Sequence, residues 1–446
     1  MPYERPAYED MQSKFESLLA RFKDASTAEE CFSIYKEYDD YYAEYITVVK
    51  LARIRHSLDT TDEFYSKEKE YWDMTAPKLQ EVAQKFTTAL LNSPFRKDME
   101  SAWGHLMFTN AEMELKTFEP EIIADLQEES ALQAEYTMLT ASAQIDFDGK
   151  KLSLAEMYPY YEDPDRAIRK GAKDAAAKWS MSKSEQMESI FDQLVKVRTT
   201  IAKKLGYENF VQLGYYRMQR NCYDQDMVAE FRKGVIKHIV PVVVEIKKAK
   251  AKRIGVDTIR VYDQYFDYPE GNAKPEGTAE EIFANGKKMY HELSSETAEF
   301  IDFMLDNELF DVKIRPGKAY DCYCSTLPKY KSPFIFANFN GTSFDIAALT
   351  HEAGHAFASY MANDIYPSDL KYYSLEIAEI HSIAMEFFTW PWMKEFFGED
   401  AHKYCYSHLS NVVSDLPLAT MIDEFQHHIY QNPKPRKRYQ SPALKR

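Results

Sequence analysis

The pentapeptide His351-Glu352-Ala353-Gly354-His355 constrains this chain more than any other feature of its sequence. Residues four positions apart on an α-helix lie on nearly the same face, so both imidazoles can bind one metal ion. Glu352 can take a proton from a metal-bound water without becoming a ligand itself, and this arrangement is typical of zinc peptidases. The alternative is a surface helix that carries His and Glu by chance. The mainly apolar residues at 346–349 and 356–358 argue against it, because two histidines in an apolar helix need a partner.

Composition and charge exclude several classes of function. With 446 residues the chain is long enough for two or three domains, or for one large helical body with a lobed shape. Its formal net charge of −16 argues against a nucleic-acid surface.

The five cysteines are odd in number and scattered, which favours a reducing compartment. The N-terminus lacks a signal-peptide pattern, and the most apolar run, residues 239–246, is interrupted by Pro241. We therefore expect a cytoplasmic protein with no membrane span and no nucleic-acid partner.

Helical periodicity dominates the chain and predicts a mainly α fold. Glycine is scarce, at 14 residues, and apolar residues recur at steps of three and four. One such stripe comprises Met11, Phe15, Leu18, Leu19 and Phe22. Stripes of this kind are typical of the buried face of a helix.

One β-hairpin interrupts the predicted helices, near residues 143–154. Apolar residues alternate with polar ones there, and Asp148-Gly149 supplies the turn. We place a boundary after the hairpin. The chain then divides into an N-terminal helical region, residues 1–190, and a C-terminal catalytic region, residues 191–446, which holds the metal motif.

A catalytic zinc site usually has three protein ligands and one open position, so a third ligand is needed. The next predicted helix, residues 374–388, carries Glu376, Glu379 and Glu386. Steps of three and seven place all three near one face of the helix, so periodicity does not choose among them. At least two of these glutamates must then be ordinary helix-surface residues or residues that support the site.

Three segments, residues 334–342, 349–357 and 375–386, resemble the oligoendopeptidase F and thimet-oligopeptidase group of zinc peptidases. In that group the second helix carries a glutamate ligand, a serine three positions later and another glutamate at seven. Ser382 and Glu386 stand in this register after Glu379. The resemblance implies a large, mainly helical, two-lobed metallopeptidase with a small β-sheet near the zinc helix.

The resemblance also implies the roles of the site residues. One Zn²⁺ per chain is bound by His351, His355 and Glu379. Glu352 is the general base, which accepts a proton from the zinc-bound water and returns it to the leaving amine. Glu386 becomes a candidate for orienting a ligand histidine. The implied substrates are short, unstructured oligopeptides.

Residues 332–339 are rich in β-branched and aromatic residues and predict a strand that ends at Asn340-Gly341. One interpretation is an ordinary buried strand. The other, which the resemblance favours, is an edge strand that pairs with an extended peptide substrate through main-chain hydrogen bonds.

The sequence departs from this group at its C-terminus. Members usually continue well past the segment that matches residues 426–430, and the continuation supplies a histidine and tyrosines that stabilise the oxyanion. Here the last 13 residues carry six positive charges and no acid, and we expect a catalytic region that is C-terminally incomplete. His427, His428, Tyr430 and Tyr439 are the candidates to replace those donors.

Bulky residues also stand where the group has small ones. Tyr320-Asp321-Cys322 replaces glycines that let a substrate backbone approach closely, and Phe344 stands where a small residue is common. The leading expectation is a zinc-dependent endopeptidase. Two alternatives stay open, namely a zinc- and peptide-binding remnant with little or no hydrolytic activity and a metal-free helical interaction protein.

Overall fold

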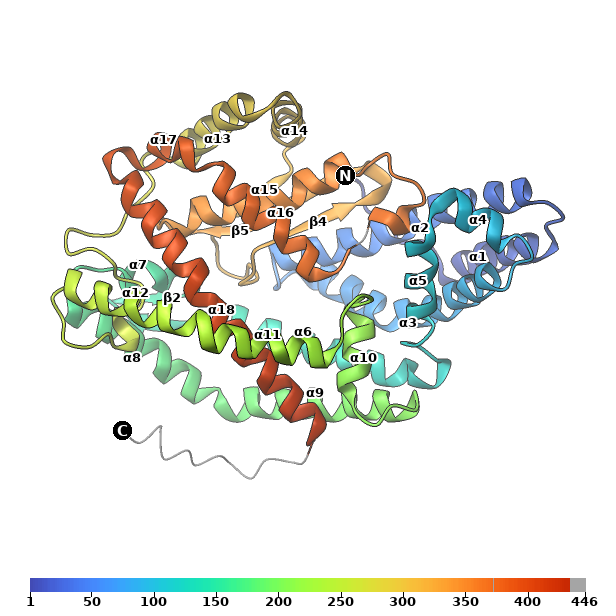
Figure 1. Ribbon diagram of the computed structural model, residues 1–446, viewed down its shortest axis with the longest axis horizontal. Coiled ribbons are helices and arrows are strands. Elements are labelled where there is room, and N and C mark those ends of the chain that lie inside the picture. Colours follow the sequence, from blue (N-terminus) through green and yellow to red (C-terminus); the bar gives the residue numbers. More distant parts are fainter. Residues whose placement is uncertain (372, 434–446) are drawn as a thin grey trace.

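The computed structural model describes residues 1–371 and 373–433, and Figure 1 shows that helices make up most of it. The α-helices are α1 (Tyr8–Asp24), α2 (Ala28–Leu58), α3 (Glu63–Leu91), α4 (Arg96–Trp103), α5 (His105–Glu114), α6 (Ile123–Ala141), α7 (Tyr158–Tyr161), α8 (Arg166–Ser182), α9 (Ser184–Lys204), α10 (Phe210–Arg217), α11 (Gln225–His238), α12 (Val240–Arg253), α13 (Ala279–Leu293), α14 (Ser295–Asp306), α15 (Phe344–Met361), α16 (Leu375–Phe388), α17 (Met393–Phe397) and α18 (Ala401–Gln431). The strands are β1 (Ile145–Phe147), β2 (Lys150–Leu152), β3 (Phe310–Lys313), β4 (Tyr323–Leu327) and β5 (Ser332–Phe339). The prediction of a mainly α fold is confirmed. No helix within the described residues is long and apolar enough to cross a membrane.

The hairpin and the first apolar stripe lie where the sequence predicts them. β1 pairs antiparallel with β2, and the turn residues Asp148 and Gly149 have φ angles of 51° and 69°. Two residues in the left-handed region form the two-residue turn whose twist matches that of the strands. All five apolar residues of the stripe are buried on α1. Residue 190, where we divide the chain, lies inside α9, which packs on both α6 and α10.

The second sheet has three strands in the order β3-β5-β4. β5 is parallel to β3 and antiparallel to β4, so its backbone is paired on both sides. The prediction of an edge strand at residues 332–339 is therefore wrong, and the interpretation as a buried strand is right. Successive residues Ile335, Phe336 and Ala337 are all buried, which is typical of a strand covered on both faces. β4 lies at an edge of this sheet, where Lys50 of α2 donates to the carbonyl of Thr326 at 2.9 Å.

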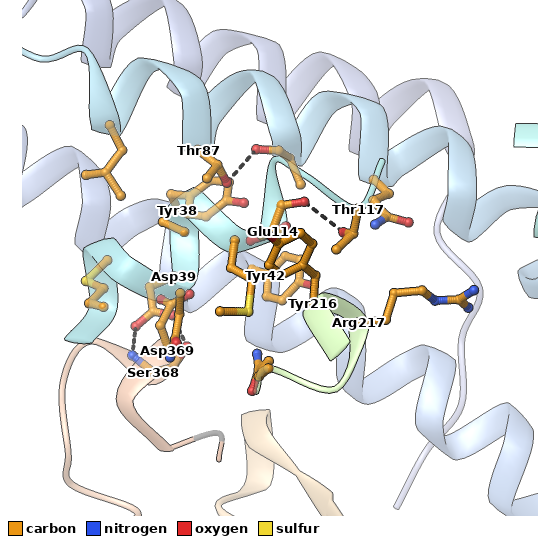
Figure 2. Close-up of a pocket in the computed structure, with 18 of the residues that line it drawn as sticks. Tyr38, Asp39, Tyr42, Thr87, Glu114, Thr117, Tyr216, Arg217, Ser368 and Asp369 are labelled. Carbon is orange, nitrogen blue, oxygen red and sulfur yellow. Dashed lines mark hydrogen bonds between the residues drawn. The ribbon is translucent and has the colours of Figure 1, made fainter. Parts of the chain in front are cut away.

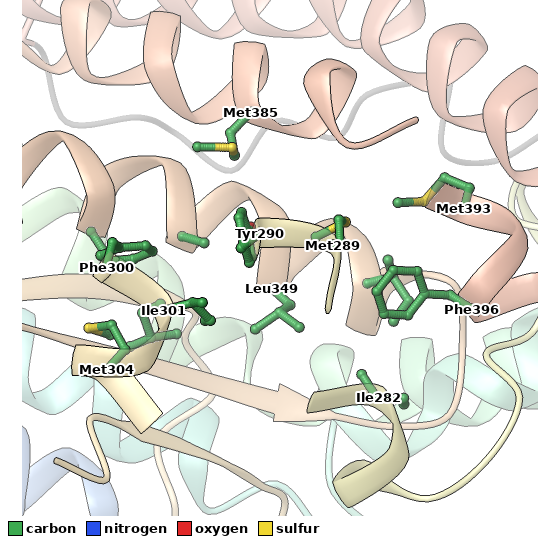
Figure 3. Packing of buried hydrophobic residues seen from close by; sticks show 14 of the residues in the cluster. Ile282, Met289, Tyr290, Phe300, Ile301, Met304, Leu349, Met385, Met393 and Phe396 are labelled. Carbon is green, nitrogen blue, oxygen red and sulfur yellow. The ribbon is translucent and has the colours of Figure 1, made fainter. Parts of the chain in front are cut away.

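One apolar core surrounds α15. It combines residues of α13, α14, β5, α15, α16 and α17. Figure 3 shows Leu349 of α15 near Met289 and Tyr290 of α13 and Ile301 of α14. Full burial of each such side chain stabilises the fold by roughly 1.5–3 kcal/mol. Because α15 is packed by apolar residues on several sides, it is a rigid support for the polar side chains that it carries.

α18 connects this core to a second one. Near its start Tyr404 packs into the core around α15, whereas Ile429 and Tyr430 near its end pack with residues of α9 and α10. Figure 1 shows the helix running diagonally between these two parts of the molecule, and it also packs on α11 and α12. α18 thus ties the layer formed by α9 to α12 to the helices that carry the metal motif.

Candidate active site

A tight turn sets the direction of α15 after β5. The backbone N–H groups of Asn340 and Gly341 both donate to the carboxylate of Asp345, at 2.8 Å each. Burial raises the pKa of Asp345 to about 6, although these two hydrogen bonds act in the opposite direction. From this turn α15 runs along the sheet, in contact with β4 and β5, and carries the metal motif in its middle.

Gly354 allows α16 to lie unusually close to α15. A Cβ at this position would lie 2.6 Å from Cα of Ser382 and 2.7 Å from the carbonyl oxygen of His381. Real Cβ atoms essentially never come this close to backbone atoms, so any side chain here would push α16 away. The glycine in the motif is therefore required by the helix packing and not by its own conformational freedom, since no positive φ occurs at this position.

The close packing brings one carboxylate of α16 to the two histidines of α15. One ligand atom from each of His351, His355 and Glu379 lies within 4.8 Å of the other two. Oε2 of Glu379 is 3.1 Å from Nε2 of His351 and 3.8 Å from Nε2 of His355. Ser382, three residues further along α16, donates from its hydroxyl to the same Oε2 at 2.9 Å. Two imidazole nitrogens and one carboxylate oxygen are a donor set that suits catalytic zinc.

The charges of these three side chains depend on one another. Burial opposes protonation of His351, but hydrogen bonds to Glu379 and Glu386 outweigh it and raise the pKa of His351 to about 10. Burial, and then the nearby charge of His351, lower the pKa of His355 to about 4. The hydrogen bond from His351 holds the pKa of Glu379 at about 2. The two carboxylates thus favour a positive charge on His351, next to the position that a bound cation would take.

Glu352 lies beside the three candidate ligands and is buried, with 5% of its surface exposed. Burial raises the pKa of this carboxyl, although the charge of His351 and the thiol of Cys322 lower it. Its Oε2 atom is buried and has no hydrogen-bond partner within residues 1–371 and 373–433. Buried carboxylate oxygens are normally paired, so the unpaired oxygen and the raised pKa make Glu352 a candidate for a group that exchanges protons.

Glu386 hydrogen-bonds one of the two histidines, His351, which is the contact that the role implied by the resemblance requires. Its Oε1 accepts a hydrogen bond from Nδ1 of His351 at 2.7 Å, so that Nε2 of His351 faces Glu379. Its Oε2 pairs with Nε2 of His408 from α18. Sequence reasoning missed His408, because a single histidine in a long helix, with no fixed spacing to the metal motif, looks like any other helix residue.

Glu376, the third glutamate of α16, has a different partner. Arg220, which follows α10, donates from Nε to Oε1 of Glu376 at 2.7 Å. The ion pair joins the layer of α9 to α12 to the start of α16. The structure therefore gives different partners to three glutamates that periodicity alone could not distinguish: Glu379 faces both histidines, Glu386 pairs with His351 and His408, and Glu376 forms a salt bridge.

The bulky residues that depart from the resembling group meet at one small cavity. Tyr320, Asp321, Cys322 and Phe344 all line it, and its volume is about 150 Å³. The Cys322 thiol interacts with the carboxyl of Glu352 and lowers the pKa of that carboxyl. The cavity therefore lies next to the candidate general base.

The C-terminal candidates for oxyanion donors that can be located, His427 and Tyr430, have their partners on α9 and α10. Arg198 of α9 donates to the hydroxyl of Tyr430 at 2.8 Å. Nε2 of His427 is 3.2 Å from the hydroxyl of Tyr215 on α10. His428 is exposed on α18, and Tyr439 lies outside the described residues. His427 and Tyr430 thus help to hold α18 against α9 and α10.

A larger cavity of about 410 Å³ lies apart from the metal motif, among α2, α3, α5 and α10. Figure 2 shows Tyr38, Glu114 and Asp369 among the residues around it. Burial and the charge of Asp369 raise the pKa of Glu114 to about 7. The described residues that line this cavity include none of the three candidate ligands.

The packing at Gly354 leads to a testable prediction. Gly354→Ala should lower the free energy of unfolding by on the order of 1–3 kcal/mol, the usual cost of overpacking, because the new methyl group meets backbone atoms. Gly234→Ala on α11 is the matched control, since no atom lies within 4 Å of a Cβ there. Urea unfolding of both variants measures the difference. Equal stability of the two variants would show that α16 is not held against α15 at this point.

Comparisons with known proteins place this geometry in a family. The family model for the Peptidase M3 N-terminal domain matches residues 1–118, and that for Peptidase family M3 matches residues 160–444. Oligopeptidase PepF of Bacillus subtilis is 22% identical over 342 residues, which are 73% of this chain and 50% of the relative. Group B oligopeptidase PepB of Streptococcus agalactiae is 22% identical over 392 residues, 82% of this chain and 61% of the relative. The chain thus spans between half and about three fifths of these two relatives.

Two solved structures are more similar. A crystal structure of an oligoendopeptidase F from Bacillus anthracis has a TM-score of 0.96 and 45% identity, and the match covers 98% of this chain and 80% of that one. PZ peptidase A, solved with an inhibitor, has a TM-score of 0.96 and 47% identity, covering 97% of this chain and 77% of that one. With the metal motif, the helical fold and both family models in agreement, this chain belongs to peptidase family M3.

Proposed function

We propose that this protein is a zinc-dependent endopeptidase that hydrolyses short, unstructured peptides. The observation that carries the proposal is the convergence of His351, His355 and Glu379, with the buried carboxylate of Glu352, whose Oε2 is unpaired in the described part of the chain, beside them. The names of the relatives support the substrate class, since they are oligopeptidases and oligoendopeptidases.

The residues present fit a zinc ion. His351, His355 and Glu379 would hold it, and a set of two nitrogens and one carboxylate leaves a further position open. The carboxylates of Glu379 and Glu386 raise the pKa of His351 to about 10, so the site stabilises positive charge, as a metal site should. When bound, zinc supplies Lewis-acid chemistry and makes water at the site much more acidic than in bulk.

The residues of the chain would divide the remaining tasks. Glu352 would accept the proton of the attacking water and pass it to the leaving amine, and its raised pKa suits both directions of transfer. Ser382 and Glu386 would keep Glu379 and His351 in place through their hydrogen bonds. No side chain is required to form a covalent intermediate with the substrate.

Zinc content should distinguish the glutamates of α16. Glu379→Ala should lower bound zinc sharply, because it removes one of the three converging ligand atoms. Glu376→Ala should retain one zinc per chain, because Glu376 pairs with Arg220 and does not face the histidines. Both variants can be compared by elemental analysis after dialysis against a weak chelator. Equal zinc retention in the two would remove Glu379 from the ligand set.

Hydrolysis should test the role of Glu352. Glu352→Gln keeps the size of the side chain and removes its ability to take a proton, so turnover of a quenched fluorescent peptide should fall by about 100- to 10,000-fold. Zinc content should stay at one per chain, because Glu352 is not among the converging ligand atoms. A variant that loses its zinc would contradict the assignment of Glu352 as a base.

A second candidate function is zinc and peptide binding with little or no hydrolysis. The specific observation that favours it is the crowding beside Glu352, where Cys322 contacts the carboxyl and the aromatic rings of Tyr320 and Phe344 line the same small cavity. The same assay separates the two functions. Turnover by the unmodified protein that is no faster than that of Glu352→Gln, at equal zinc content, would favour the binding function.

A further inference from the structure

A chain of hydrogen bonds continues behind Glu386 and ends at an indole. Trp390 lies in a short 3-10 helix, Trp390–Trp392, that directly follows the C-cap of α16. Its Nε1 donates to Nδ1 of His408 at 3.2 Å. Nε2 of His408 pairs with Oε2 of Glu386, and Oε1 of Glu386 pairs with Nδ1 of His351 at 2.7 Å. Four side chains from α15, α16, α18 and this short helix are thus connected in one line.

The indole fixes the direction of its bond to His408, and the carboxylate of Glu386 fixes the direction of the bond to His351. Trp has one N–H and no acceptor nitrogen, so Nδ1 of His408 must accept. A neutral His408 then carries its proton on Nε2 and donates it to Glu386. Oε1 of the Glu386 carboxylate remains an acceptor, so His351 donates from Nδ1. The lone pair of a neutral His351 is therefore on Nε2, the atom that lies 3.1 Å from Glu379.

We propose that Trp390 and His408 are positioning residues that fix the tautomer and ring orientation of His351 for metal binding. The inference rests on the proposed function, because it assumes that His351 binds zinc. It goes beyond that function by extending the metal site to two residues that touch neither metal nor substrate. His408 acts through Glu386, and Trp390 acts through His408.

Packing around His408 supports a fixed ring orientation. His408 is 7% exposed, and its ring stacks on Tyr404 with an interplanar angle of 16°. Phe387 and Trp390 contact the same ring at centroid distances of 5.0 and 5.7 Å. The imidazole is thus enclosed by aromatic side chains, and its two nitrogens point at the only polar partners that the described residues offer it.

The burial of Glu386 explains why His408 and Trp390 affect the orientation of His351. The side chain of Glu386 is only 9% exposed, so loss of His408 would leave Oε2 buried without a donor. A buried carboxylate oxygen without its donor is costly, and the side chain relieves that cost by rotating toward another donor. The rotation weakens its hold on His351. Outer hydrogen-bond partners of metal ligands typically change metal affinity by about 10- to 100-fold when removed.

The test compares zinc affinities of three variants with the unmodified protein, by competition with a chromophoric chelator. His408→Phe keeps an aromatic ring and removes both nitrogens, and the Kd for zinc should rise by about 10- to 100-fold. His408→Gln keeps an amide N–H that can donate to Glu386 and should recover most of that loss. Tyr404→Phe is the control, because its hydroxyl is buried without a hydrogen-bond partner in the described part of the chain, and its Kd should match the unmodified protein.

Nitrogen-15 NMR of the histidine rings supplies a second readout that a purely structural role would not produce. In the zinc-loaded protein, His408 should be the Nε2–H tautomer and His351 the Nδ1–H tautomer. Trp390→Phe should shift the nitrogen-15 resonance of Nδ1 of His408, which loses its hydrogen-bond donor, while the fold, judged by circular dichroism, is unchanged.

The outcomes separate this inference from the proposed function. No zinc binding by the unmodified protein would overturn the proposed function. Normal binding by the unmodified protein together with a Kd for His408→Phe within twofold of it would overturn only the inference. An Nδ1–H tautomer at His408 would also overturn it, because the bond from Trp390 would then be impossible.

Discussion

The close approach of α16 to α15 at Gly354 is the constraint on which the rest of the site depends. Backbone atoms of His381 and Ser382 occupy the space that a Cβ of residue 354 would need. Glu379 and Glu386 lie on either side of this contact along α16. A single shift of α16 would therefore withdraw the carboxylate that faces both histidines and the carboxylate that supports one of them. The apolar core around α15 keeps one helix fixed, and the glycine lets the other helix reach it.

The site also shows how a cluster of ionisable groups can lie beside an apolar core. Burial of unpaired charges is costly, so each group needs a partner of its own. His351 lies between Glu379 and Glu386, and Glu386 is shared with His408. Oε2 of Glu352 has no hydrogen-bond partner within the described residues, and neither do Oε2 of Glu376 and Nε2 of His381 on α16. Of these three groups only Glu352 has a raised pKa, and it is the residue to which we assign proton transfer.

Much of this arrangement could be predicted from the sequence, for identifiable reasons. The spacing of His351 and His355 depends only on helix geometry, and the two-residue turn at Asp148-Gly149 depends only on local backbone preference. Periodicity could not distinguish Glu376 from Glu379, because both lie near one face of the same helix. Their separate roles are set by partners distant in the sequence, Arg220 for one and the histidine pair for the other.

Two features had no reliable signal in the sequence. Residues 332–339 form a strand as predicted, but a run of apolar residues says nothing about which strands lie beside it, so the prediction of an edge was wrong. His408 lies on α18, whose path depends on packing against two separate cores. A histidine of this kind is found only when the fold is known. Gly354 belongs to the metal motif, but the sequence does not explain why a glycine is needed there. The explanation is the close packing of α16 against this position.

The central claim is that α15 and α16 together form one zinc site. The most direct measurement is an anomalous difference map from crystals grown with one equivalent of zinc, collected on both sides of the zinc absorption edge. We predict one strong peak at about 2.0–2.2 Å from Nε2 of His351, Nε2 of His355 and a carboxylate oxygen of Glu379. A peak that contacts only one of these helices, or no peak within reach of Glu379, would contradict the account.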